Sequence, residues 1–497
     1  MLKRLSNLEP RALNAALVTV FGFFVLFTAI HAVGYHHADE HYQIIEFANH
    51  FLGNVEGSQL SWEFQYKIRP TIQPLMAAFL ISVCKWFGVR DAFDVMVIIR
   101  VLTGLFAMVV YLDFIKGLMR RHCSKLTYIW VVGAFGLWYM PYLMIRFSSE
   151  NFASLFFLLG YSSLILKTNK NFLLSGIFLG LSFAFRFQIG IAIAGITLYL
   201  VIVESIKWKY LLQLILGGSL VLVALVLLDR VFYNEWVFTP WKYVQLQLME
   251  GRAAGFGVDP WWKYFEFLWE GLTWVVAIPL LIGIVVLFVK KRTQPFFFVA
   301  IPFLVVHLFI GHKELRFLYP VLFCVPLILF KLMKLFEYKW RLQRMAVAVV
   351  LGFSIINIAG MVLLVPGPSG VGRIKLAEYV YDKHPQEPVL LFYKNYCNPF
   401  EPWAGGNHAY FYHNTCPNVK TKFVEHLEDI NKVEDSRNEG HYLIARQLDF
   451  EVIGKAPTDF SERFESVSVS YSELQLRVGR FMGLINEDEV YYLFRLK

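Results

Sequence analysis

The sequence has few cysteines and few charged residues. Its five cysteines are scattered, with no C-x-x-C pair and no zinc-ligand spacing, so it shows no thiol redox motif and no zinc site. Charged residues make up only 17% of the 497 residues, whereas hydrophobic residues make up 57%. This balance excludes a soluble globular chain. Apolar segments of about 17–25 residues, the length that spans a bilayer core, recur along it, so the sequence predicts a membrane protein.

Three other features are absent. The basic start of the chain leads into an apolar segment long enough to stay as the first span, so no cleavable signal peptide is expected. The net charge of +9 does not indicate a nucleic-acid partner, because the lysines and arginines fall in short clusters between apolar segments, as positive-inside loops do. No N-x-S/T sequon occurs in the segments predicted outside, which favours a bacterial inner membrane over the endoplasmic reticulum.

The apolar segments predict about eleven membrane crossings, with the N-terminus inside and the C-terminus outside. The segment Thr71–Phe87 is not counted, because a crossing there would invert every later basic loop. Its Lys85 and the prolines Pro70 and Pro74 fit a re-entrant or interfacial element. The predicted crossings lie at residues 12–33, 94–116, 127–145, 151–167, 171–187, 188–204, 209–228, 272–290, 295–311, 317–333 and 345–365.

Two soluble pieces are predicted outside the membrane. The loop 229–271 is rich in glycine and tryptophan, which suit sugar stacking or headgroup contact, although the aromatic belt is the commoner role of an interfacial tryptophan. The second piece follows a Pro/Gly-rich linker. This division predicts a transmembrane catalytic domain over residues 1–365 and a C-terminal domain outside the membrane over residues 366–497.

The C-terminal domain is predicted to be a small α/β domain. Its runs Pro388–Tyr393 and His441–Ala445 are typical of buried strands between helical segments. Cys397 and Cys416 lie in this domain, on the oxidising side of the membrane. They either pair or remain two free buried thiols, and the sequence leaves both alternatives open.

A polar stretch, His36–Gln43, H-H-A-D-E-H-Y-Q, comes directly after the first apolar segment. Two adjacent carboxylates, Asp39 and Glu40, stand there among three histidines. The simplest interpretation is a helix N-cap at Asp39 that opens an interfacial helix over residues 40–52. A cap uses one carboxylate and leaves the histidines unexplained, so the stretch predicts a site at the outer membrane surface.

A second polar stretch, Gly311–Phe317 (G-H-K-E-L-R-F), lies at the outer mouth between two predicted spans. Charges this dense at a span end are either anchors or functional groups. Lys313 and Arg316 suit a phosphate, because arginine binds it with a bidentate fork and lysine as a point charge.

Further arginines also fall at predicted outer ends, against the positive-inside bias. Each needs an anionic partner, and two alternatives stay open: a phosphate-bearing lipid outside, or ion pairs with nearby carboxylates. The arginines are Arg69, Arg146 and Arg186, and the carboxylates are those of Asp39, Glu40, Glu150 and Glu314.

In order and spacing, these motifs resemble those of the Alg9-like mannosyltransferases, glycosyltransferase family 22. The family has a histidine–any–aspartate–glutamate motif after the first span, matched by His37-Ala38-Asp39-Glu40. Its threonine-tryptophan-glutamate-aromatic motif resembles Ser61-Trp62-Glu63-Phe64. Departures stand at Ala38, Pro70 and Glu150. The other matches are Arg69 with Pro74, Phe232-Tyr233-Asn234-Glu235-Trp236, Gly257-Val258-Asp259-Pro260-Trp261, and His312-Lys313-Glu314 followed by Arg316-Phe317.

The resemblance implies a GT-C fold: an all-α polytopic membrane protein with its active site on the non-cytoplasmic face. The implied donor is polyprenyl- or dolichyl-phosphate mannose, and the implied acceptor is a lipid-linked glycan, both presented in the membrane lipid. Asp39 would act as the base, with Glu40 in reserve, and the sugar would transfer with inversion. Donor-phosphate binding falls to His312, Lys313, Arg316 and Arg69, and substrate binding to His37, Trp62, Glu63 and Trp261.

No metal or other cofactor is implied, although Asp39 and Glu40 with a histidine are of the types that bind metal. The rival function from another class is a transporter or flippase of lipid-linked glycans. Transporters usually show internal repeats and polar groups near the bilayer midplane, whereas this sequence shows no repeat and gathers its charges at the outer mouths. A GT-C transferase that uses another sugar is not separated from a mannosyltransferase. The expected location is a bacterial inner membrane with a periplasmic site, or the endoplasmic reticulum with a luminal one.

Overall fold

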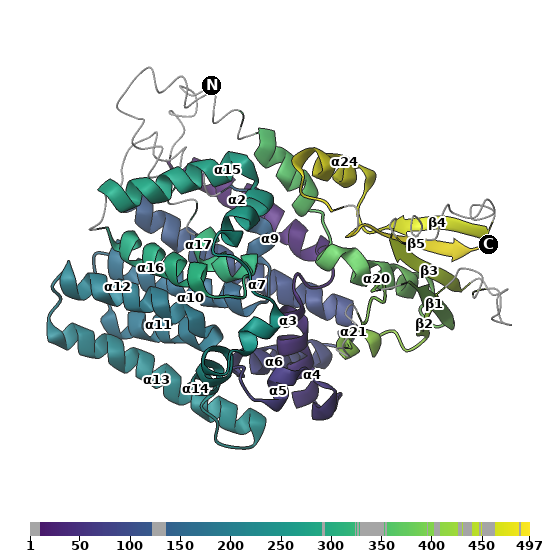
Figure 1. Ribbon diagram of the computed structural model, residues 1–497, viewed down its shortest axis with the longest axis horizontal. Helices are drawn as coiled ribbons and strands as arrows, with labels where there is room; N and C mark the ends of the chain where they lie inside the picture. The colour runs from purple at the N-terminus through teal and green to yellow at the C-terminus, as the bar shows by residue number, and fades with distance from the viewer. Residues whose placement is uncertain are drawn as a thin grey trace. The chain divides into compact units, whose positions relative to one another are not determined.

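The structure of the protein is a computed structural model, drawn as a ribbon in Figure 1. Its helices account for most of the elements, and its strands belong to the C-terminal part of the chain. The structure describes residues 10–121, 136–290, 294–323, 355–394, 396–401, 408–425, 440–446, 463–486 and 489–497, and the single residues 325, 328, 352, 430 and 449.

The chain forms two compact units, and each is built from separate stretches of the sequence. Unit 1 comprises Met1–Leu26, Tyr66–Gln73 and Val101–Met361. Unit 2 comprises Phe27–Gln65, Pro74–Arg100 and Val362–Lys497. The boundary predicted between residues 365 and 366 stays a prediction.

Within unit 1, α11 (Phe172–Phe185) packs against both α10 (Ser149–Tyr161) and α13 (Trp208–Tyr233), and α12 (Gly190–Ile202) packs against α16 (Pro295–Phe309). The turn predicted between the segments 171–187 and 188–204 is confirmed. There Arg186 has an extended backbone (φ −151°, ψ 116°) that ends α11.

Glycines allow α11 and α13 to approach closely. A methyl group on Gly176 would lie 2.2 Å from the carbonyl oxygen of Leu214, and one on Gly217 would lie 2.3 Å from that of Leu173. Small residues at such contacts are typical of helix pairs in membranes, where close packing replaces the hydrophobic effect as the source of association.

The described helices support a multi-pass membrane protein. Among them, three are long and apolar enough to cross a bilayer: Ala92–Leu118, Ser149–Leu166 and Trp208–Tyr233. Shorter apolar helices occur as well, and the segment predicted to be re-entrant forms one of them, α6 (Ile72–Trp86). The number of crossings stays a prediction. The predicted spans 127–145, 317–333 and 345–365 lie partly outside the described residues.

The loop predicted over residues 229–271 is shorter than expected. Helix α13 continues to Tyr233, and α15 (Lys263–Lys290) begins well before residue 272. Between them lie α14 (Thr239–Val244), a π-helical turn (Gln245–Met249) and a 3₁₀ turn (Arg252–Phe256). The prediction missed these boundaries because it located the spans by hydropathy, and Asp229 and Lys263 interrupt the apolar runs while the helices continue through them.

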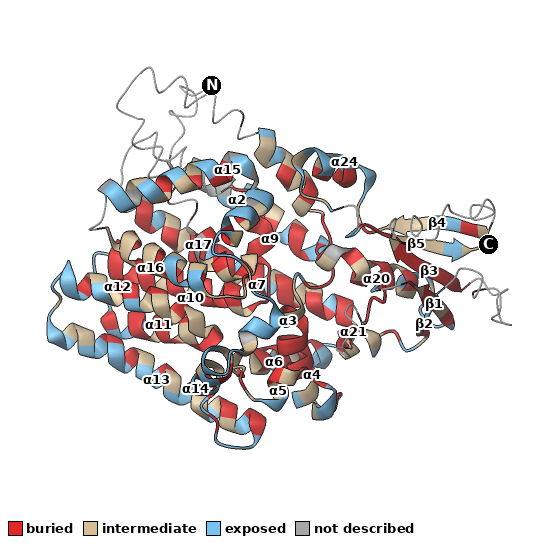
Figure 2. Ribbon diagram, in the orientation of Figure 1, coloured by how far each residue is buried: buried red, intermediate tan, exposed pale blue. Residues whose placement is uncertain are grey.

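Unit 2 contains a five-stranded sheet in the order β2-β1-β3-β5-β4. The strand β1 (Val389–Tyr393) pairs in parallel with β2 (Val419–Phe423) and β3 (His441–Arg446), whereas β5 (Tyr491–Leu496) pairs antiparallel with β3 and β4 (Phe464–Val469). Strand β3 is buried along nearly its whole length, as Figure 2 shows. Both predicted strands are present. They could be predicted because a strand buried on two faces has a continuous apolar run, which is visible in the sequence.

The helices of the C-terminal segment are α20 (Arg373–Lys383), α21 (Tyr410–His413) and α24 (Glu473–Met482). Cys397 and Cys416 are both buried and free, so the disulfide alternative is excluded. Burial raises the pKa of the Cys416 thiol to about 12. Burial and the neighbouring carboxylate of Asp449 also raise the pKa of Cys397, so both thiols stay protonated at neutral pH.

Candidate active site

The carboxylates Asp39 and Glu40 lie in a single helical turn, Ala38–Glu40, which we call the motif turn. His37 caps this turn: its backbone is extended, and its Nδ1 accepts the backbone N–H of Asp39 at 3.2 Å. The N-cap interpretation of Asp39 was therefore wrong, because the capping group is a histidine ring two residues earlier. The run continues as a π-helical turn (His41–Ile45) and α4 (Glu46–Phe51).

The two carboxylates of the motif turn have different surroundings. Glu40 is buried, and its Oε2 accepts the backbone N–H of His36 at 2.7 Å. The side chain of Asp39 is 20% exposed, and its Oδ1 lies 3.8 Å from Nδ1 of His37. Asp39 is thus the more accessible of the two, while Glu40 holds the backbone that precedes it.

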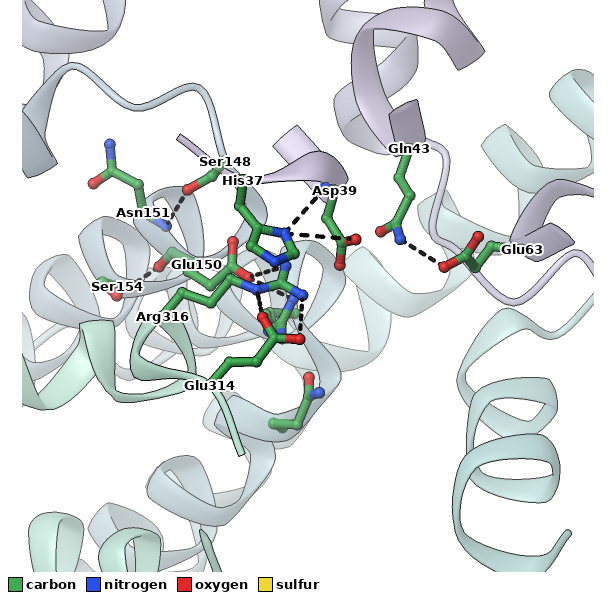
Figure 3. Close-up of polar contacts among 12 residues, drawn as sticks. His37, Asp39, Gln43, Glu63, Ser148, Glu150, Asn151, Ser154, Glu314 and Arg316 are labelled. Carbon is green, nitrogen blue, oxygen red and sulfur yellow. Dashed lines mark hydrogen bonds and ion pairs between the residues drawn. The ribbon is translucent and has the colours of Figure 1, made fainter. Parts of the chain in front are cut away.

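The second predicted motif lies near the same stretch of unit 2. Trp62 and Glu63 are in α5 (Trp62–Gln65), and Oε1 of the buried Glu63 accepts Nε2–H of Gln43 at 2.7 Å (Figure 3). Gln43 belongs to the π turn that follows the motif turn. The structure therefore joins the two motifs through one buried hydrogen bond.

In unit 1, charged residues that are far apart in the sequence form one buried network, which we call the guanidinium cluster: Glu150, Arg186, Glu314 and Arg316. Oε1 of Glu150 accepts Nη1 of Arg186 at 2.8 Å and Nη1 of Arg316 at 3.0 Å. Arg316 also donates Nε and Nη2 to the two oxygens of Glu314 (Figure 3).

The helix that carries Glu150 explains its position. Ser148 caps α10 by accepting the backbone N–H of Asn151, which places Glu150 in the first turn. A carboxylate there is favoured by the positive end of the helix dipole. With its side chain only 4% exposed, Glu150 compensates the burial of two arginines.

This network gives Arg186, one of the three arginines at predicted outer ends, a carboxylate partner within the protein. Arg316, predicted to bind phosphate, pairs with the same carboxylate. Arg146 is buried with its guanidinium 4.4 Å from the ring of Tyr142. The segment of Arg69 is fixed through its backbone, because Tyr233 donates its hydroxyl to the Arg69 carbonyl at 2.8 Å. In the sequence, Arg186 stands out only by its predicted side of the membrane, and nothing there identifies it as a site residue.

Lys313 and His312 connect the guanidinium cluster to the Gly-x-x-Pro-Trp motif. Nζ of Lys313 donates to the backbone carbonyl of Asp259 at 3.1 Å, and the backbone N–H of Asp259 donates to the backbone carbonyl of Gly311 at 2.9 Å. Nε2 of His312 lies 2.8 Å from Oε1 of Glu314. Burial lowers the pKa of Lys313, and the charge of Asp259 opposes this shift.

Trp261, at the end of the same motif, is 55% exposed. Its ring lies 5.8 Å from that of Trp262, edge to face. Among the described residues, no group of three or more histidines, cysteines or carboxylates is arranged to hold a metal ion.

Comparison with known proteins gives the family. The model of the Alg9-like mannosyltransferase family matches residues 17–368, which is more than half of the chain. The chain belongs to this family. The match includes the motif turn and the guanidinium cluster, and the resemblance seen in the sequence motifs is confirmed.

The individual curated relatives are distant from this chain in sequence. GPI alpha-1,2-mannosyltransferase 3 of Xenopus laevis is 25% identical over 292 residues, which cover 57% of this chain and 53% of that protein. Mannosyltransferase APTG1 of Arabidopsis thaliana is 23% identical over 315 residues, covering 61% of this chain and 56% of that protein. The chain thus spans about half the length of the curated relatives it matches.

Among solved structures, ArnT from Cupriavidus metallidurans, bound to undecaprenyl phosphate, is similar over 98% of both chains, with a TM-score of 0.46 and 11% identity. The GT-C fold of this chain stays a prediction, as do the roles of the individual site residues.

Proposed function

We propose that this chain transfers a mannosyl residue from a polyprenyl- or dolichyl-phosphate sugar to a hydroxyl of a lipid-linked glycan. The reaction takes place on the non-cytoplasmic face of the membrane. One observation carries the proposal: Asp39 presents a partly exposed carboxylate in a turn capped by His37, within a motif of the Alg9-like family. The relatives named as GPI mannosyltransferases support mannose as the sugar.

In this mechanism Asp39 removes the proton of the acceptor hydroxyl as the oxygen attacks the anomeric carbon. The bond from that carbon to the phosphate oxygen breaks, and the lipid phosphate leaves with the electron pair. Attack on the face opposite the leaving group inverts the configuration. Glu40 holds the turn and acts as the reserve base, while His37, Trp62, Glu63 and Trp261 orient the sugars.

The departing phosphate needs positive charge. Lys313 supplies a point charge in a buried setting, where fewer waters screen it. His312, Arg316 and Arg69 are the other groups assigned to the phosphate. Because Glu150 and Glu314 already bind Arg316, we assign Arg316 mainly to the electrostatic field of the site. Lys313, whose Nζ donates to the backbone carbonyls of Asp259 and Ile310, would exchange one of these neutral acceptors for the phosphate.

The test is mannosyl transfer from radiolabelled polyprenyl-phosphate mannose in membranes that contain wild-type or Asp39→Asn chains. Wild type is expected to label a glycolipid, and Asp39→Asn to lose roughly 10²-fold or more of the rate, the usual contribution of a general base. The control is Asp113→Asn. Asp113 lies on α7 (Ala92–Arg121) and its carboxylate pairs with Lys167, so this variant should retain activity. Equal transfer by well-folded Asp39→Asn would refute the base assignment, and no label with wild type would refute the donor.

A further inference from the structure

A buried histidine–glutamate pair directly follows the motif turn. Nε2 of His41 lies 2.8 Å from Oε1 of Glu46, and the two side chains are 1% and 2% exposed. The His41 ring stacks on Tyr35 and on Tyr412, with centroid distances of 4.7 and 5.2 Å and interplanar angles below 20°. Because both side chains are buried, their close approach depends on the hydrogen bonds that Glu46 receives from other groups.

Glu46 provides those further hydrogen bonds. Its Oε1 also accepts the backbone N–H of Phe411, in α21, at 2.8 Å, and its Oε2 accepts Nδ2–H of Asn49 at 3.2 Å. One carboxylate therefore joins the π turn, α4 and the C-terminal segment of unit 2.

The π turn explains why these two side chains meet. The backbone N–H of Glu46 donates to the carbonyl of His41, five residues earlier, so the wider turn places the two residues on the same face. The backbone N–H of His41 donates to Ala38 and closes the motif turn. His41 thus directly follows Glu40, and its backbone ends the motif turn. Its ring contacts Glu46 and Tyr35, which hold this end of the turn in place.

We propose that His41 and Glu46 are positioning residues for Asp39, and that α21 takes part in this support through the Phe411 N–H. The inference rests on the proposed function, because it assigns the pair to the base of that reaction. Neither residue contacts substrate in this account. They hold the backbone from which Asp39 projects, and a displacement of about 1 Å in a reacting group costs roughly a hundredfold in rate.

The test uses Glu46→Gln and His41→Phe in the full chain. Gln keeps the volume of Glu46 and an oxygen for the Phe411 N–H, and Phe keeps the stacking of His41. Each variant is expected to lower kcat by roughly tenfold to a hundredfold. The KM values should stay within about twofold, since a positioning residue affects the transition state rather than binding. Backbone amide exchange of residues 36–45 should become faster.

The matched control is His384→Phe, which removes another histidine–glutamate pair in unit 2 (Nδ1 to Oε2 of Glu387, 2.7 Å) and should leave kcat unchanged. Unchanged kcat in both test variants would overturn the proposal. So would a lower yield of folded protein with unchanged kcat per folded molecule, because that is a purely structural role. If wild type transfers no mannose, the proposed function fails, and amide exchange of residues 36–45 alone decides whether the pair orders the motif turn.

Discussion

Glu150 binds two guanidinium groups with one oxygen atom in a site where almost no water reaches it. Removing a single partner from such a network leaves a buried charge without compensation, which costs about 3–5 kcal/mol.

Glu150→Gln is expected to lower the thermal unfolding midpoint in detergent clearly, because Arg186 and Arg316 lose their common counter-charge. The control is Glu266→Gln, which breaks an exposed pair with Lys263 on α15 and should change the midpoint little. Equal midpoints for Glu150→Gln and wild type would show that the network is solvated rather than buried.

Glu378, in α20, gives a pH-dependent contribution. Burial, with repulsion from Asp382 and Asp91, raises its pKa from 4.5 to about 7, although Arg100 and Lys375 act in the opposite direction. Between about pH 4.5 and pH 7 the folded state therefore holds a proton that the unfolded state has lost. Stability from this group is present below this window and is lost as the pH rises through it.

Glu378→Gln should therefore flatten the fall in unfolding midpoint between pH 5 and pH 8, and should stabilise the chain most at the alkaline end. The comparison is with Glu387→Gln, whose side chain is 73% exposed. Parallel pH profiles for wild type and Glu378→Gln would contradict the raised pKa.

At the scale of the element, the close contact between α11 and α13 depends on glycines, because a side chain larger than hydrogen would not fit at these positions. Gly176→Ala is expected to disrupt the α11–α13 pair and to reduce the yield of folded protein, because the new methyl would lie 2.2 Å from a backbone oxygen. Gly218→Ala is the matched control one position after Gly217, since its methyl would meet nothing closer than 3.8 Å. The measurement is the monodisperse fraction on size-exclusion chromatography, and equal fractions for the two variants would contradict the packing.

The elements could be predicted where one physical signal dominates. Apolar length located α7, α10 and α16, and the continuous apolar run located β1 and β3. The motif turn was also found, because its carboxylates stand out after an apolar segment. The π turn was not, because a widened turn has no composition of its own, and the charged helix ends at Asp229 and Lys263 were read as loop.

The site was predictable as motifs but not as pairs. Nothing local in the sequence links Glu150 to Arg186 and Arg316, because tertiary packing alone brings residues of such separation together. Arg316 stands out as part of a dense polar stretch, whereas Arg186 stands out only by its predicted side of the membrane. That signal identified the need for an anion, and the structure supplied the carboxylate.

At the scale of the whole molecule, unit 2 joins residues 27–65 to residues 362–497. Within it, Ser369 donates its backbone N–H to the carbonyl of Val33 at 2.9 Å and its hydroxyl to the carbonyl of Ala32 at 3.0 Å. The hydrogen bond from the Phe411 N–H to Glu46 joins the same two segments. The C-terminal segment is thus part of the framework that supports the motif turn.

A chain that ends at residue 365 is therefore expected to lose mannosyl transfer and to become sensitive to protease between residues 27 and 65. Limited proteolysis in membranes, followed by mass spectrometry, measures this. If residues 27–65 of the shortened chain resist the protease as they do in wild type, this stretch of unit 2 folds without the C-terminal segment.

The sheet order has a consequence for biosynthesis. The strand β5 (Tyr491–Leu496) lies between β3 and β4, so the sheet stays incomplete until this segment has been synthesised and has left the ribosome. At about 5–20 residues per second, the stretch that bears Asp39 waits roughly 20–90 s after its own synthesis for the rest of its unit. During that interval its apolar side chains lack the partners that later bury them, so slower synthesis of the β5 segment is expected to expose them longer to chaperones and proteases.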